Sequence, residues 1–251
     1  MNDWTVKVRI ENKHLITEID GHMLLIDTGS PTSFGTCSFT WEDEKVDISN
    51  WLKTFDLDVL RGQVGLPIEG LIGCDLLLQR GLRIDLPNGE LTLHDEIPAH
   101  RGDCKLGTVM SVPVVTSYVG ESRSVAIDTG AMQSFIKEKD TIGLKRVGTV
   151  KDFYPGGGEF IAEVVEAQIL IGDNCPLIEV AVAPALLEAQ LTAMGITGIF
   201  GLDVLKDEVF ELAPTCGYIT PFISVMDLES APKEVYVYGT QTDDIVSPPE
   251  K

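Results

Sequence analysis

Two stretches of this chain, Leu24-Leu-Ile-Asp-Thr-Gly-Ser30 and Val125-Ala-Ile-Asp-Thr-Gly-Ala131, decide its fold because they are nearly the same sequence. Each is an apolar run, typical of a buried strand, that ends in Asp-Thr-Gly. One Asp-Thr-Gly is a common turn, whereas two copies inside a longer repeat indicate two related halves. Pseudo-twofold symmetry between the halves is expected to bring the carboxylates of Asp27 and Asp128 face to face.

The repeat extends upstream of both stretches. Residues 14–27 are predicted to form a hairpin with Asp20-Gly21 as its turn. Residues 111–128 are predicted to form a second hairpin, with its turn near residues 120–122. Each half therefore carries its Asp at the end of the second hairpin strand.

The repeat also extends downstream. Residues 70–78 match residues 198–205, since each is an apolar strand followed by a glycine and an aspartate. That aspartate, Asp75 or Asp203, is expected to bind free backbone N–H groups in the first turn of a helix. A strand pair follows each copy, the first with Asn88-Gly89 as its turn.

Three segments follow from this pattern, and the class is mostly β. Residues 1–98 form an N-terminal half and residues 99–225 a C-terminal half. The boundary is drawn where a proline, a glycine and alternating charge interrupt the pattern. Residues 226–251 form an extension whose polar end is expected to be disordered.

The net charge of −20 argues against binding to nucleic acid or to an anionic membrane. Residues 152–205 contain no Lys or Arg at all. We expect this acidic surface to keep the protein soluble, and a preference for cationic peptides is the alternative interpretation.

No targeting or metal-binding pattern is found. The start, Met-Asn-Asp-Trp-Thr-Val-Lys, lacks the basic and apolar regions of a signal peptide, so we expect a cytoplasmic protein. The most apolar stretch, residues 180–205, is interrupted by polar residues and is expected to be buried core. The five cysteines have no metal-ligand spacing and are expected to be reduced thiols, so we expect no metal and no cofactor.

The repeated motifs resemble those of pepsin-like and retropepsin-like aspartic peptidases, with both halves fused in a single chain. Besides Asp-Thr-Gly, each half has the apolar-apolar-Gly of that family, Leu71-Ile-Gly73 and Ile199-Phe-Gly201. The resemblance covers residues 5–222 and implies the acid protease fold with the active site between the two halves. It further implies a monomer with an intramolecular pair of catalytic residues, Asp27 and Asp128, acting on a peptide or protein substrate.

The resemblance also implies roles for the residues around the two aspartates. Thr28 and Thr129 are expected to interlock, each hydroxyl bonding the backbone of the other loop. Gly29 and Gly130 are expected to let backbone N–H groups approach the carboxylates. Supporting hydroxyl groups are expected at Ser30, Ser33 and Ser134.

Two carboxylates held about 3 Å apart cannot both ionise readily, so they share one proton. The ionised member polarises a water molecule, and the protonated member donates to the scissile carbonyl oxygen. The sequence alone does not assign the proton, because such a pair titrates as a unit.

The two copies differ at the residue after each glycine, which is Ser30 in the first and Ala131 in the second. In the family a hydroxyl at this position often bonds the outer oxygen of the Asp. Its loss in the second copy is expected to raise the pKa of the pair. We therefore predict a mildly acidic to near-neutral pH optimum.

A glycine-rich hairpin is predicted over residues 150–165 of the second half. Its tip contains Gly156, Gly157 and Gly158, and its position after Asp128 is typical of a flap that covers substrate. Tyr154 is a candidate to cover the carboxylates, although its offset matches poorly. The first half shows one predicted strand, residues 38–46, and no comparable hairpin, in contrast with both retropepsins and pepsins.

Other interpretations remain open. A binding module could keep the fold without turnover, although both Asp-Thr-Gly copies are intact. Asp-Thr-Gly could instead belong to a phosphoryl or Mg²⁺ loop, but the required alternation of strands and helices is not seen. The motifs could also be two unrelated turns.

Aromatic residues that could line a substrate pocket are expected at Phe34, Phe135, Phe153 and Tyr154. Aromatic residues of the hydrophobic core would look the same in the sequence.

Overall fold

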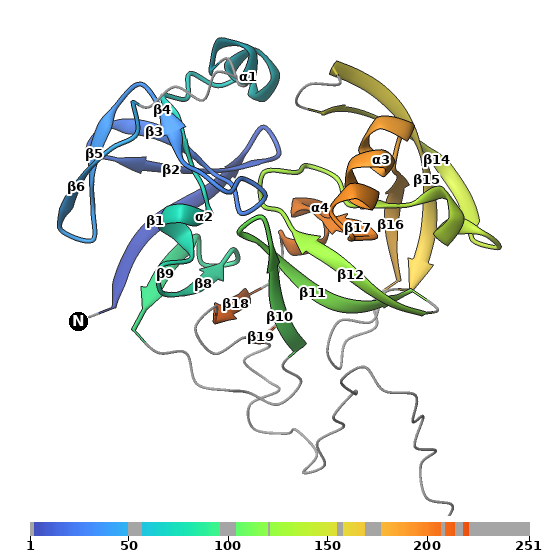
Figure 1. The fold of residues 1–251 in the computed structure, drawn as a ribbon. Helices are drawn as coiled ribbons and strands as arrows, with labels where there is room; N and C mark the ends of the chain where they lie inside the picture. The colour runs from blue at the N-terminus through green and yellow to red at the C-terminus, as the bar shows by residue number, and fades with distance from the viewer. Residues whose placement is uncertain are drawn as a thin grey trace, which may run out of the picture.

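The computed structural model describes residues 3–49, 57–95, 104–119, 121–154, 158–168, 177–206, 209–213 and 218–220. These residues are mostly β (Figure 1). The predicted disordered end, the predicted boundary near residue 98 and the flap-tip residues Gly156 and Gly157 lie outside the described residues.

The N-terminal half contains nine strands and two helices among its described residues. They are β1 Trp4–Glu11, β2 His14–Ile19, β3 His22–Ile26, β4 Phe34–Gly35, β5 Ser38–Trp41, β6 Glu44–Asp47, α1 Leu57–Val64, β7 Gly70–Ile72, α2 Cys74–Leu77, β8 Gly81–Asp85 and β9 Glu90–His94.

The C-terminal half repeats this order and adds two elements, η1 and β16, among its described residues. Its elements are β10 Cys104–Val109, β11 Val112–Val119, β12 Glu121–Ile127, β13 Phe135–Ile136, the 3-10 helix η1 Glu138–Thr141, β14 Lys145–Tyr154, β15 Gly158–Gln168, β16 Leu177–Val182, α3 Ala185–Ala193, β17 Gly198–Phe200, α4 Leu202–Leu205, β18 Val209–Ala213 and β19 Tyr218–Thr220.

The same pairing scheme positions the Asp-Thr-Gly loop in each half. In the first, β2 and β3 form a hairpin, β3 runs parallel to β7, and β4 pairs antiparallel with β7. In the second, β11, β12, β17 and β13 repeat these relationships. The loop between β3 and β4 therefore passes the end of β7, and the loop between β12 and β13 passes the end of β17.

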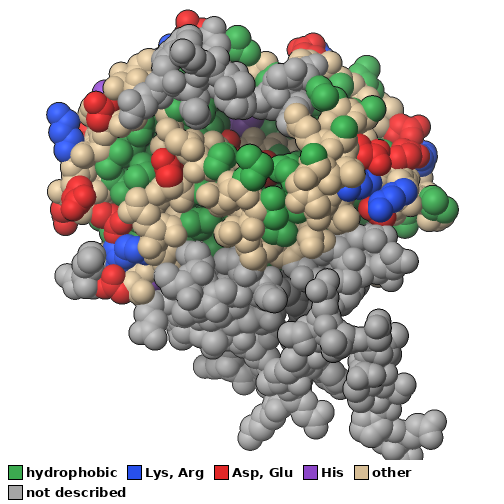
Figure 2. Space-filling model, viewed as in Figure 1, with side chains coloured by type: hydrophobic (Ala, Val, Ile, Leu, Met, Phe, Trp, Pro, Cys, Tyr) green, Lys and Arg blue, Asp and Glu red, His purple; other side chains and the backbone are tan. Residues whose placement is uncertain are grey.

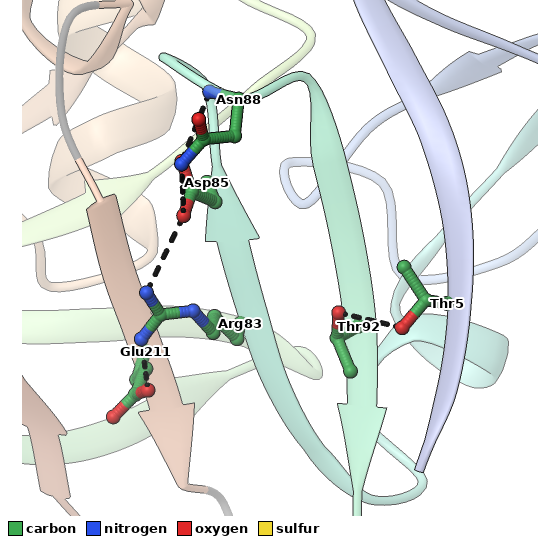
Figure 3. Close-up of polar contacts among 6 residues, drawn as sticks. All are labelled: Thr5, Arg83, Asp85, Asn88, Thr92 and Glu211. Atoms are coloured by element: carbon green, nitrogen blue, oxygen red, sulfur yellow. Dashed lines mark hydrogen bonds and ion pairs between the residues drawn. The ribbon is translucent and has the colours of Figure 1, made fainter.

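A six-stranded antiparallel sheet joins the halves. Its order is β1–β9–β8–β18–β19–β10, so the central pair, β8 and β18, contributes one strand from each half. Within that pair Arg83 lies directly opposite Glu211, and their side chains form an ion pair of 2.8 Å (Figure 3). The main hydrophobic core includes residues of both halves, such as Leu82 and Phe210, both of which are buried.

The predicted turns are confirmed in one case and corrected in another. Asp20 and Gly21 form the two-residue turn between β2 and β3, with φ of 53° and 82°. The link between β8 and β9 is longer than the predicted Asn88-Gly89 turn, because Asp85 pairs with Glu90 across four linking residues. The carboxylate of Asp85 accepts hydrogen bonds from the backbone and side chain of Asn88, which shapes that link (Figure 3).

The prediction of a single strand over residues 38–46 is wrong. Glu42 and Asp43 have positive φ and divide this segment into the hairpin β5–β6. The Trp41 ring packs against Trp4 with centroids 4.4 Å apart, which holds the hairpin on the outer side of the N-terminal half (Figure 1). It occupies the same place in the chain order as β14–β15 in the second half.

Candidate active site

The two aspartates follow directly after β3 and β12. The backbone N–H of Asp27 donates to Ile72 O at 3.0 Å, and that of Asp128 donates to Phe200 O at 2.9 Å. Each bond extends the parallel strand pairing by one residue. The parallel pairs thus fix the point at which each aspartate leaves its sheet.

The two carboxyl groups lie against each other's loops. A Cβ atom added to Gly29 would overlap the carboxyl of Asp128, and one added to Gly130 would overlap that of Asp27. Only glycine allows this approach at either position. Both aspartates remain partly exposed, and this face of the molecule is hollowed between the halves, with acidic and histidine surface visible inside the hollow (Figure 2).

Thr28 and Thr129 interlock beneath the carboxyl groups. Thr28 Oγ1 donates to Ile127 O at 2.8 Å and accepts from Thr129 N at 3.0 Å. Thr129 Oγ1 donates to Ile26 O at 2.9 Å and accepts from Thr28 N at 3.0 Å. Both threonines are fully buried, and each hydroxyl bonds the backbone of the other half as expected from the resemblance.

Each carboxyl receives a matching pair of backbone donors. Asp27 Oδ1 accepts from Gly29 N at 2.8 Å and Ser30 N at 3.0 Å. Asp128 Oδ1 accepts from Gly130 N at 2.9 Å and Ala131 N at 3.0 Å. These donors favour the ionised form of both carboxyl groups.

The burial of the two carboxyl groups and their proximity to each other outweigh the effect of these donors on the pKa values. The pKa of Asp27 lies well above its ordinary value because the carboxyl is buried and faces Asp128. Burial also raises the pKa of Asp128, against the N–H groups of Ala131 and Gly130. Two close carboxyl groups with raised pKa values can hold one proton between them.

The expected contact between the Ser30 hydroxyl and Asp27 is not formed. Ser30 Oγ instead donates to Thr32 O at 2.9 Å. The donor atoms bonded to Asp27 and Asp128 are therefore equivalent backbone N–H groups, and the Ser30/Ala131 difference does not reach the carboxyl oxygens.

Ser33 and Ser134 support the loops from behind. Ser33 Oγ donates to Asp75 Oδ1 at 2.6 Å and accepts from Gly73 N at 2.9 Å. Ser134 Oγ makes the same two bonds to Asp203 Oδ1 and Gly201 N, at 2.6 and 2.9 Å. Both serines are buried.

The expected role of Asp75 is thereby corrected, whereas that of Asp203 is confirmed for one backbone N–H of its helix. Each takes up the backbone N–H and the hydroxyl of its serine, at 2.8 and 2.6 Å for Asp75. Asp203 also accepts from Gln133 Nε2 at 2.7 Å and from Val204 N at 3.0 Å, which is its only bond to its own helix among the described residues. These carboxylates fasten the loop after each Asp-Thr-Gly to the helix that follows the glycine strand.

Two further residues touch the loops and were not predicted from the sequence. The buried Cys74 thiol donates to Thr28 O at 3.1 Å, and burial raises its pKa to about 12. The buried His14 imidazole lies near the backbone of Gly130 in the other half. Alignment of the two repeats would have marked both positions, since the second copy has Leu202 and Val112 there.

The predicted flap is a hairpin, longer than expected. Strands β14 and β15 pair antiparallel from Lys145↔Glu166 to Tyr154↔Gly158. Gly158 has φ of 76°, which favours glycine at the start of β15. Tyr154 ends β14, and its side chain lies outside the described part of the structure.

The expected pocket aromatics fall into different classes. Phe34 and Phe135 are buried in the satellite cores of the two halves, so they are packing residues. Phe135 packs against Phe160 with ring centroids 5.9 Å apart. Phe153, next to the hairpin tip, is partly exposed and remains a candidate for substrate contact.

Among the residues that the structure describes, no group of three or more His, Cys, Asp or Glu side chains could hold a metal ion. Within the same residues, no helix is long and apolar enough to cross a membrane.

Comparison with known proteins shows the fold. The chain matches basic 7S globulin from soybean with a TM-score of 0.51 and 9% identity, over 95% of this chain and 100% of that chain. It also matches aspartic proteinase from Irpex lacteus with a TM-score of 0.47 and 12% identity, over 89% and 98%. No protein-family model and no curated protein sequence matches the chain. The chain is mostly β and shares the fold of basic 7S globulin, and its two halves resemble those of the pepsin-like acid protease fold.

Proposed function

We propose that this protein is an aspartic endopeptidase that hydrolyses peptide bonds with Asp27 and Asp128. The observation that carries the proposal is the mutual placement of the two carboxyl groups. Each lies against the glycine of the opposite loop, receives two backbone N–H donors and remains partly open to solvent. Neither the fold nor the sequence motif alone would distinguish an active site from an inactive relative.

The geometry supports a reaction without a covalent intermediate. A water molecule between the carboxyl groups gives up a proton to the ionised aspartate as it attacks the scissile carbonyl carbon. The protonated aspartate donates to the carbonyl oxygen, which gives a tetrahedral diol. The aspartate that took the proton from water then passes it to the nitrogen. The C–N bond breaks as one diol hydroxyl gives its proton to the other aspartate, so the amine leaves and the pair is singly protonated again.

The interlocked threonines supply the rigidity that this chemistry needs. They make no contact with the carboxyl oxygens in the bonds described above, but they fix both loops through four buried hydrogen bonds. Positioning of reacting groups accounts for a large part of enzymatic rate enhancement. The proposed substrate is a peptide or protein segment in the hollow, covered by the β14–β15 hairpin.

The single chain supplies both aspartates, so we propose a monomeric enzyme with one intramolecular active site. Among the described residues, we assign the flap of this proposed enzyme to the β14–β15 hairpin of the C-terminal half.

Digestion of a diverse peptide library near pH 5–6.5 tests the proposal directly. We expect cleavage by the unmodified protein and a loss of at least about 10³-fold in Asp27→Asn and Asp128→Asn. Asp43→Asn is the matched control, because Asp43 is exposed in the β5–β6 turn.

Cleavage that survives either active-site substitution would refute the carboxyl pair as the catalyst. Binding of peptides without any cleavage would instead identify the protein as a peptide-binding module on the same fold.

A further inference from the structure

The β14–β15 hairpin carries a buried acidic residue on its inner face. Strand register and burial separate the two faces of the hairpin. On the outer face, Lys151 and its cross-strand partner Ile161 are exposed. On the inner face, Asp152 is 7% exposed and its partner Phe160 is partly buried. A carboxyl group therefore lies on the face that the hairpin turns toward the body of the protein.

The packing of Phe160 places this inner face beside the loop of Asp128. The rings of Phe160 and Phe135 lie 5.9 Å apart between centroids, and Phe135 begins β13 just after that loop. Side chains directly opposite each other in an antiparallel pair have Cβ atoms about 5 Å apart, so Asp152 is next to Phe160. The end of the hairpin beyond Asp152 is directed toward the N-terminal half (Figure 1).

Nothing in the described part of the chain neutralises the Asp152 carboxylate by direct contact. Its Oδ1 accepts from the backbone N–H of Phe153 at 2.7 Å, and no Lys, Arg or His of the described residues forms an ion pair with it. Residues 152–205 contain no Lys or Arg. Withdrawing a carboxylate from water is costly without a cationic partner, so a cation brought from outside the chain would stabilise this group.

Charged groups of both halves act on Asp152 at longer range. Burial has the largest effect and raises the pKa of Asp152, and the N–H of Phe153 lowers it. Lys13, an exposed residue of the opposite half, lowers this pKa, and Asp203 on α4 raises it. These effects agree with a position between the halves, on the side of the hairpin that faces the hollow.

We propose that Asp152 is a specificity-determining residue that pairs with a Lys or Arg side chain of the substrate peptide. The inference rests on the proposed function and deepens it, because it names the substrate class as peptides with a basic side chain beside the scissile bond. The aliphatic stem of such a side chain packs on Phe160 while its charged end meets the carboxylate. The net charge of −20 attracts the same peptides over longer distances.

Peptide binding to a protein that does not cut tests the inference separately from cleavage. The probes are octapeptides from a positional library in which each position carries either lysine or norleucine, its uncharged analogue. Binding is measured on Asp27→Asn, which keeps Asp152. We expect lysine at one position to bind at least about 10-fold more tightly than norleucine, and addition of Asp152→Asn should abolish that difference.

Glu159→Gln is the matched control, because it removes one negative charge from the outer face of the same hairpin. Glu159 is exposed and pairs with Lys151 at 2.7 Å, so this variant should keep the lysine preference. Asp152→Asn should melt no lower than the unmodified protein, since its carboxylate forms no ion pair within the described residues. A lysine preference that survives Asp152→Asn, an equal loss in Glu159→Gln, or a fall of several degrees in the melting temperature of Asp152→Asn would overturn the proposal.

Cleavage assays distinguish this inference from the proposed function. If peptides are cut, Asp152→Asn should raise KM for the preferred lysine peptide at least about 10-fold and leave its kcat unchanged. Cleavage without a lysine preference would overturn the inference and leave the proposed function standing. Lysine-dependent binding through Asp152 without any cleavage would support the inference and refute the proposed function. Failure to bind any peptide would overturn both.

Discussion

Single hydroxyl groups fix the relation between the two halves. Thr28 and Thr129 each satisfy one donor and one acceptor of the opposite half inside a fully buried interface. A buried group that loses its partner costs about 1–3 kcal/mol of stability. The threonine pair is thus a stability determinant as well as a positioning device.

We expect Thr28→Val to lower the free energy of unfolding by about 3 kcal/mol, because it leaves Thr129 N–H and Ile127 C=O without partners. Thr28→Ser keeps the hydroxyl and should cost no more than about 1 kcal/mol. Urea unfolding followed by fluorescence measures both. A valine variant as stable as the serine variant would contradict the assigned role of the hydroxyl.

The raised pKa of Asp27 predicts a stability cost that grows with pH. The folded state keeps its proton where the unfolded chain, with a carboxyl pKa of about 4, has lost it. Stability therefore falls as pH rises from about 4 toward the raised pKa, and the cost remains above it.

Asp27→Asn removes this cost, so we expect it to melt several degrees higher than the unmodified protein near neutral pH. Near pH 3 both proteins carry an uncharged side chain at this position and should melt alike. Calorimetry across this pH range, with Asp43→Asn as the control, measures the difference. A variant that melts lower at neutral pH would show that the pair is not under electrostatic strain.

Contacts between equivalent positions of the two repeats could be predicted from the sequence. Contacts of residues outside the matched motifs could not. Asp27 with Asp128 and Thr28 with Thr129 come together because their loops are equivalent. The Ser30 contact was predicted wrongly, since a carbonyl two residues ahead competes for the hydroxyl. His14 was missed because the loop that it lies near, at Gly130, belongs to the other half and no motif links them.

At the scale of elements, the serine–aspartate pairs hold β4 to the β7–α2 segment and β13 to the β17–α4 segment. Each serine hydroxyl both donates to the helix aspartate and accepts from the glycine before the helix. Each short helix has only four residues and no side-chain cap, so its position depends on these bonds.

Ser33→Ala and Ser134→Ala should each lower the free energy of unfolding by about 2 kcal/mol, because each leaves a buried glycine N–H unbonded. Ser30→Ala is the matched control, and a loss below about 0.5 kcal/mol is expected because its hydroxyl bonds an exposed backbone carbonyl. Chemical denaturation measures all three. Unequal costs in Ser33→Ala and Ser134→Ala would argue against equivalent roles for the two copies.

Strong turn chemistry in the sequence predicted where hairpins form, although the Asn88-Gly89 signal predicted too short a link between β8 and β9. Asp20-Gly21 gave the correct turn, because both residues tolerate positive φ. The β5–β6 hairpin was missed because its turn uses Glu42 and Asp43, which carry no such signal. The helices α2 and α4 were predicted in the right place, but tertiary bonds to Ser33 and Ser134 set the role of their aspartates.

At the scale of the whole molecule, the six-stranded sheet joins the two halves. Arg83 on β8 bonds Glu211 on β18 and also Asp85, at 2.8 and 3.4 Å (Figure 3). Glu211 is buried, so the guanidinium of Arg83 offsets a charge that water reaches poorly.

Arg83→Met should lower the free energy of unfolding by about 2–3 kcal/mol, less than for a fully buried pair because Arg83 is partly exposed. The loss should shrink when Glu211→Gln is added, since position 211 then carries no charge for Arg83 to offset. Thermal unfolding of the two single variants and the double variant measures this coupling. Additive losses would show that the two side chains do not interact energetically.

The strand order of this sheet also determines how late in synthesis the sheet can form. β8 is made early in synthesis, but its neighbour β18 begins only at Val209, and β10 acquires β19 only at Tyr218. Until those strands leave the ribosome, the sheet that joins the halves is incomplete, and Asp128 is not held opposite Asp27. Under the proposed function, the growing chain is therefore not exposed to cleavage by its own active site before β18 and β19 have been made.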